Sequence, residues 1–110
     1  MASTKNLAHL SAPEILEMGQ QVTRLRIPSD RPFDYQTYLL EKPHRLVIDT
    51  QGTVLAEREN VREIRASSNL ERIRTEAGNR AQNTDLRFIL DLRGEVTFQH
   101  SYHNNYVEIL

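Results

Sequence analysis

The sequence predicts an all-β fold, a sandwich of two small, pseudo-symmetric, mostly antiparallel sheets with one short helix. Residues 21–27 and 86–92 alternate apolar and polar side chains, which is the period of a half-buried strand. Residues 33–49 read as two strands joined by a turn at 41–44, and a weaker copy of this plan occupies 85–110. This repeated strand pattern indicates two structurally similar halves that pack their apolar faces together.

The bulk composition narrows the class of protein. The chain has 110 residues, enough for one domain, and we expect residues 21–110 to form it with 1–20 as an N-terminal edge segment of the same domain. Because 14 basic and 15 acidic residues nearly cancel, we expect no nucleic-acid partner. The absence of cysteine excludes disulfides and thiolate metal sites. No apolar run approaches the ~18 residues of a membrane span, so we expect no membrane insertion.

The first segments combine one ambiguous stretch with one clear strand. Residues 7–16 fit either a short helix with Ser11 as its N-cap and Glu14 three residues later, or an edge strand before Ser11. Residues 21–27 place Leu25 and Ile27 on one face and arginines on the other. This alternation predicts a strand with a solvated arginine face.

The next stretch is read as a hairpin. Two prolines within 28–32 indicate a turn, since proline cannot donate a ladder hydrogen bond. Residues 33–40 are aromatic-rich and strand-like, but their apolar side chains change parity, so a bulge near Gln36 and Thr37 is predicted. Residues 45–49 form a strand with Leu46 and Ile48 inward.

The middle of the chain is charged and carries the predicted helix. Residues 54–64 are rich in Glu and Arg with plausible i,i+4 partners, which favours a short helix. Strands are predicted at 70–76 and 86–92. Two more are predicted at 96–102 and 106–110, around a turn at 103–105.

The two copies can be laid over each other. Residues 24–27 correspond to 87–90, 33–35 to 96–98, and 46–48 to 107–109. We expect each copy to be a three-strand meander that forms its own sheet.

One stretch resembles a known family, the AMIN domain. The residues that carry the resemblance are Tyr35-x-x-Tyr38-x-Leu40-x-x-Pro43-x-Arg45-Leu46-Val47-Ile48-Asp49. It continues through 71–74 and 86–92 and covers about residues 21–110. The chain departs from the family pattern at Lys42, where Asn is usual, and at 75–78, where a small residue and Gly-Gln are frequent.

The resemblance implies a non-catalytic module of the periplasm. It implies peptidoglycan binding and targeting of a larger cell-wall amidase to the division septum, with divisome or secretin proteins as further partners. The alternative is a protein–protein anchoring domain of a type IV pilus secretin. No cofactor is implied.

Arginines on the predicted solvent faces are the candidate ligand-binding residues, because guanidinium binds carboxylates bidentately and tyrosine stacks on sugar rings. The set is Arg24, Arg45, Arg74, Arg87 and Tyr106. The competing interpretation is that these arginines pair with carboxylates across the strands and protect the sheet from aggregation.

Catalysis and metal binding find little support in the sequence. His100 and His103 lie three residues apart, but spacing supplies no third ligand for a zinc site. No serine lies in a nucleophile elbow, and Asp49 and Asp91 are expected to lie far apart and to pair with arginines. An enzyme on a β scaffold would need a deep pocket with convergent carboxylates, so we expect no catalytic residue and no metal.

Overall fold

The computed structural model describes residues 7–18, 23–55, 61–63, 69–77, 85–103 and 106–109. For residues 17, 18, 61–63, 77, 101–103 and 106–109 it describes the backbone alone. The strands are β1 (Ala8–Leu10), β2 (Glu14–Met18), β3 (Thr23–Pro28), β4 (Asp34–Leu40), β5 (Arg45–Gln51), β6 (Thr53–Leu55), β7 (Val61–Glu63), β8 (Leu70–Ala77), β9 (Leu86–Leu92), β10 (His100–His103) and β11 (Tyr106–Ile109).

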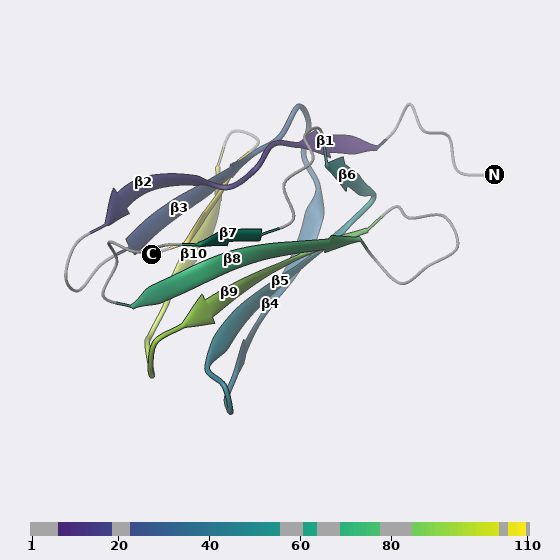
Figure 1. Cartoon of the computed structure of the whole chain (residues 1–110). Coiled ribbons are helices and arrows are strands. Elements are labelled where there is room, and N and C mark those ends of the chain that lie inside the picture. Colours follow the sequence, from purple (N-terminus) through teal and green to yellow (C-terminus); the bar gives the residue numbers. More distant parts are fainter. Residues whose placement is uncertain are drawn as a thin grey trace.

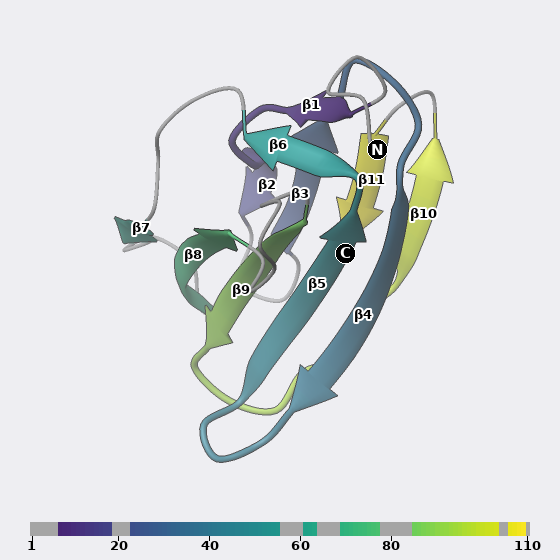
Figure 2. The same ribbon diagram turned by 90° about the vertical axis from the view of Figure 1, so that its right-hand side faces the viewer.

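The fold is all-β, as the sequence predicts, and two antiparallel sheets face each other (Figures 1 and 2). One has the order β10-β11-β3-β2 and the other the order β4-β5-β9-β8-β7. A short parallel pair, β1 and β6, lies at one end of the sandwich (Figure 1). Residues 7–16, which the sequence leaves open between helix and strand, contain β1 and enter β2.

The core lies between the inward faces of the two sheets. Alternation along β3 turns Leu25 and Ile27 inward, and alternation along β9 does the same for Phe88 and Leu90. Phe88 has no exposed surface and Ile27 only 1%. Burial of such side chains contributes about 1.5–3 kcal/mol each, so these strands hold the sandwich together.

The pseudo-symmetry is present, but the expectation that each copy forms its own sheet is wrong. The first strand of each copy pairs with the hairpin of the other, since β9 lies beside β5 and β3 lies beside β11. The sheets β4-β5-β9-β8 and β10-β11-β3-β2 therefore repeat one plan with the copies exchanged. Sequence similarity identifies equivalent strands but not which copy supplies the neighbour, because both arrangements bury the same faces.

The predicted short helix over 54–64 is wrong wherever the structure describes that range. Val54 and Leu55 belong to β6, which pairs with β1, and residues 61–63 form β7, which pairs with β8. Residues 56–60 and 64 lie outside the described residues. Strand pairing with β1 and β8 supplies backbone hydrogen bonds that outweigh the modest helix propensity of Glu and Arg.

Two further details of the hairpins differ from the sequence prediction. β4 pairs residue by residue with β5 from Asp34↔Gln51 to Leu40↔Arg45, so the bulge near Gln36 and Thr37 is absent. Tyr38 and Leu40 instead point away from the core and stay 40% and 38% exposed. A continuous ladder thus outweighs burial of these two side chains. The strand expected from residue 96 begins only at His100.

Within the described ranges, no helix has the length and apolar character of a membrane span.

Candidate ligand-binding face

The outer face of the five-stranded sheet is built by the alternation of β5, β9 and β8. Residues that pair across antiparallel strands point to the same side, so the register defines rows across the sheet. One row joins Arg45 to Asp91 and Asp91 to Arg72. A parallel row joins Asp49 to Arg87. Between them, Val47 and Ile89 form an apolar floor that is 5% and 7% exposed.

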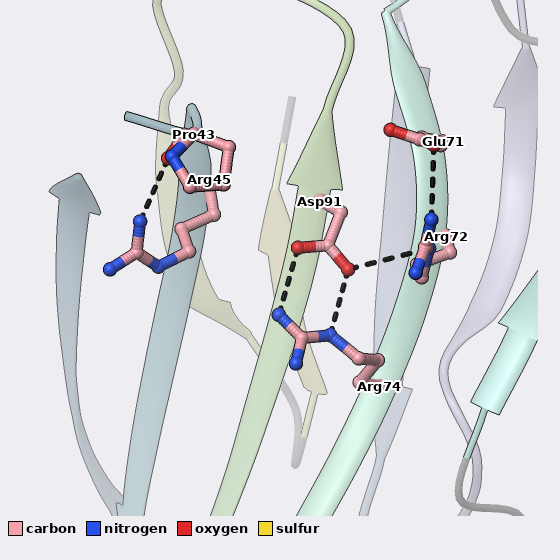
Figure 3. Close-up of polar contacts among 6 residues, drawn as sticks. All are labelled: Pro43, Arg45, Glu71, Arg72, Arg74 and Asp91. Carbon is pink, nitrogen blue, oxygen red and sulfur yellow. Dashed lines mark hydrogen bonds and ion pairs between the residues drawn. The ribbon is translucent and has the colours of Figure 1, made fainter. Parts of the chain in front are cut away.

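Asp91 is the centre of the first row. Arg74 donates to it in a bidentate arrangement, Nε to Oδ2 at 2.8 Å and Nη2 to Oδ1 at 2.9 Å (Figure 3). Arg72 Nε lies 3.7 Å from Asp91 Oδ2, and Arg72 Nη2 donates to Glu71 at 3.0 Å. The hydrogen bond to Asp91 raises the pKa of Arg74, and nearby negative charge adds to this. Two guanidinium groups therefore share one carboxylate whose side chain is only 12% exposed.

Arg45 faces Asp91 in the register but does not bind it. Its guanidinium turns toward the β4–β5 turn, where Nη1 donates to the carbonyl oxygen of Pro43 at 2.8 Å (Figure 3). The same nitrogen donates to the carbonyl oxygen of Glu41 at 3.5 Å. Within the part of the chain that the structure describes, Arg45 has no carboxylate partner. A guanidinium has five donors, so Arg45 retains the capacity to bind an external carboxylate.

Arg87 is already engaged. Its Nε donates to Asp49 Oδ1 at 2.6 Å and its Nη2 to Oδ2 at 3.2 Å. The hydrogen bond to Asp49 raises the pKa of Arg87. This pair matches the competing interpretation of the arginines, in which cross-strand ion pairs hold the outer surface.

The five candidate residues do not gather at one place. Arg45, Arg74 and Arg87 share the outer face of the five-stranded sheet, whereas Arg24 lies on β3 of the other sheet, opposite Glu17 of β2. The backbone of Tyr106 begins β11, opposite Pro28, and its side chain lies outside the described residues. Three of the candidates thus lie on the five-stranded sheet, and the other two lie on neighbouring strands of the four-stranded sheet.

The role of Asp91 as the hub was not predicted. Asp49 and Asp91 were expected far apart in the two copies, yet they lie on neighbouring strands, four residues apart along the ladder, each bound to its own arginine. A register shift between Leu70 and Arg72 puts Arg72 on the outer face while Leu70 stays buried. Alternation alone cannot locate such a shift, because it depends on the partner strand.

His100 has a different environment from a metal ligand. Its Nδ1 shares a hydrogen bond of 2.9 Å with the Tyr35 hydroxyl, and its ring stacks against Phe98 at a centroid distance of 6.1 Å. The side chain of His103 lies outside the described residues. Among the side chains that the structure describes, no three His, Asp or Glu groups gather as a metal site would require.

The family comparison agrees with this architecture. The model of the AMIN domain matches residues 15–108, and the chain belongs to that family. The match begins at Ile15 of β2, ahead of the residues that carry the resemblance in the sequence. Neither a curated protein nor a solved structure matches the chain. AMIN domains are non-catalytic, peptidoglycan-targeting domains that occur in periplasmic proteins.

Proposed function

We propose that this chain, as an AMIN domain, is the peptidoglycan-binding module that targets a larger cell-wall amidase to the division septum in the periplasm. The observation that carries the proposal is Arg45, whose guanidinium binds only backbone carbonyl oxygens within the described residues. Peptidoglycan presents carboxylates on its stem peptides, and a charge-assisted hydrogen bond to arginine is the natural contact for such a group.

The surroundings of Arg45 support a carboxylate ligand. Arg72 and Arg74 both lie on β8, two strands from β5 and on the same face as Arg45. Asp91 on the intervening strand β9 is already bound by both. Arg72 and Arg74 are neutralised by Asp91 and Glu71, whereas Arg45 has no carboxylate partner among the described residues, so its positive charge is left for a bound carboxylate. The Arg74–Asp91 ion pair joins β8 to β9 beside this face.

Binding at this face is expected to be weak. A flat sheet face buries little surface, and the ordering of long side chains costs free energy. Many copies of the ligand in a sacculus compensate for this, since the effective concentration near a polymer is high.

Sedimentation with insoluble sacculi tests the proposal. The pure domain is incubated with sacculi and pelleted, and the bound fraction is measured against salt concentration. We expect binding that weakens as salt is added. Arg45→Gln should weaken it about tenfold, the loss of roughly 1.4 kcal/mol for one charge-assisted contact. Arg31→Gln is the matched control, because Arg31 is exposed in the turn after β3 and its removal changes the net charge equally.

The outcomes separate the function from the residue. A wild-type domain that stays in the supernatant contradicts peptidoglycan binding. If the Arg45→Gln variant pellets as well as the wild type, peptidoglycan binding is supported but the role of Arg45 in it is contradicted.

A second candidate is anchoring in a type IV pilus secretin. It is favoured by the open edge of β4, since extended segments of partner proteins add to such edges. Capture of a secretin partner without glycan would support it.

A further inference from the structure

The edge of β4 is open over its second half. Among the described strands, β4 is the last of its sheet and pairs only with β5. Among the residues that the structure describes, the backbone of 36–40 has no hydrogen-bond partner outside β5. The first half differs, because Tyr35 binds His100 of β10. Tyr38, Leu39 and Leu40 are 40%, 42% and 38% exposed, so an apolar strand edge faces solvent.

Two of the other edge strands, β7 and β2, are protected in ways that β4 is not. β7 has three residues, two of them Arg62 and Glu63, and β2 carries Glu14 and Glu17 with a register shift between Ile15 and Glu17. Short length, charge and bulges are the means by which proteins blunt sheet edges. β4 has seven residues, and none after Asp34 is charged or a proline. An unprotected edge of this length is a pairing site for another strand.

The chemistry of β4 fits a copy of itself. The free stretch 36–40 has Tyr38 as its midpoint, so an antiparallel β4–β4 pair centred there uses the whole stretch in both chains. In that register Tyr38 faces Tyr38 of the second copy and Gln36 faces Leu40. Asp34 at one end of the strand then meets the turn that carries Lys42 in the other chain. Both charges are exposed and neither has an ion-pair partner among the described residues.

We propose that β4 joins two copies of this chain, edge to edge and antiparallel, about a two-fold axis at Tyr38. Facing residues of antiparallel strands point to the same side of a sheet, so both outer faces, each with its Arg45, lie on one side of the continuous sheet. The pairing stands independently of the proposed function. Where that function holds, the dimer offers two ligand-binding faces to one surface, which increases avidity.

Sedimentation velocity of the full chain tests the pairing. A five-residue strand pair buries far less than the roughly 800 Å² per partner of a stable complex, so the dimer is expected to be concentration-dependent. Between about 10 μM and about 1 mM, the mean mass should rise from 12.8 kDa toward twice that value. Asp34→Lys or Lys42→Asp alone places like charges together and should weaken the dimer about three- to tenfold. The double variant exchanges the charges and should restore it.

Engineered cysteines test the register. The natural chain has no cysteine, so each variant has a single thiol. Tyr38→Cys should form an intermolecular disulfide under mild oxidation, because facing Cα atoms lie within the range that a disulfide spans. Gln36→Cys is the matched control, since its two copies lie four residues apart along the strands, roughly 13 Å at ~3.3 Å per residue. A mixture of Gln36→Cys and Leu40→Cys should cross-link, because these positions face each other.

Each outcome decides the proposal. A chain that sediments as a monomer at every concentration overturns it and leaves the β4 edge to a strand of another protein. A dimer that is unchanged by the single charge variants also overturns it, because another surface then holds the copies together. Gln36→Cys that cross-links alone as fast as Tyr38→Cys overturns the register and the two-fold axis with it.

Discussion

The two halves of the molecule, β2–β5 and β8–β11, have the same strand plan but different outer surfaces. Leu25 on β3 and Phe88 on β9 are equivalent positions, and both are buried. In the five-stranded sheet Arg45 faces Asp91 across the ladder. The equivalent pair in the four-stranded sheet is Tyr106 and Pro28. These equivalent inward positions are therefore apolar in both sheets. At the outward position equivalent to Asp91, the four-stranded sheet has Pro28 and thus no carboxylate for arginines to bind.

The charge pattern beside these positions also differs. Arg74 is opposite Ile89 in the ladder of the five-stranded sheet. Its equivalent in the other sheet, Glu14, is opposite Arg26 and accepts a hydrogen bond from it. A buried position is costly to fill with a polar side chain that has no hydrogen-bond partner, whichever copy supplies it. An exposed position has no such constraint, so binding chemistry can arise on one sheet without disturbing the fold.

The largest expected effect tests the shared inner positions. Phe88→Ala should lower the free energy of unfolding by about 3–5 kcal/mol, and Leu25→Ala by about 2–5 kcal/mol, because each leaves a cavity in the common core. Urea unfolding followed by circular dichroism measures both. If Leu25→Ala hardly lowered the free energy of unfolding, the two sheets would not contribute comparably to the core. The equivalence of Leu25 and Phe88 would then not extend to their energetic contributions.

A smaller effect tests the difference between the outer faces. Asp91→Asn keeps the shape of the side chain but leaves Arg72 and Arg74 without their shared negative charge, so we expect a loss of about 1–2 kcal/mol. Glu14→Gln removes the charge from the ion pair with Arg26 on the other sheet, where the carboxylate side chain is 48% exposed instead of 12%. Exposed ion pairs contribute about 0–1 kcal/mol, so this variant should cost less. Equal losses in urea unfolding would contradict the comparison.

The smallest expected effect concerns the turn that follows β3, which β1 holds in place. The backbone N–H of His9 donates to Asp30 at 2.8 Å, and this bond, aided by the His9 ring at 3.0 Å, lowers the pKa of Asp30. A carboxyl whose pKa is lowered on folding contributes stability above its unfolded pKa and loses it as the pH falls through the folded value. Asp30→Asn should therefore be slightly less stable than the wild type at neutral pH and equal to it well below about pH 4.

The matched control for this measurement is Asp34→Asn. Asp34 is exposed and has no ion pair or side-chain hydrogen bond among the described residues. Below about 10 μM, where the chain is expected to be monomeric, the unfolding midpoint of Asp34→Asn should stay close to that of the wild type across the same pH range. A constant difference between Asp30→Asn and the wild type at all pH values would show that the His9 contact does not titrate with Asp30.

Much of the fold follows from local patterns. The alternation of β3 and β9, the turn at Pro43 and the inward Leu46 and Ile48 are readable because a half-buried strand needs a period of two. The helix prediction failed because the charged residues between Val54 and Val61 favour helix in isolation, while β6 and β7 pair with distant strands. The bulge prediction failed because it assumed that Tyr38 and Leu40 must be buried.

The candidate ligand-binding face could be predicted only in part from local sequence patterns. Alternation places arginines outward, but it does not say which of them meets a carboxylate. Arg74 and Asp91 are 17 residues apart and Arg87 and Asp49 are 38 apart, so both pairs depend on strand order and register.

Local sequence was sufficient for the all-β class, the repeated plan and the outward direction of the arginines, because backbone geometry makes the direction of each side chain in a strand a property of its own segment. Three features were decided by the tertiary structure. The two copies exchange their first strands, Asp91 binds Arg74 while Arg45 binds the carbonyl oxygens of the β4–β5 turn, and β4 has an open edge. These features depend on which distant strands become neighbours, and that choice minimises the free energy of the whole chain rather than of any one segment.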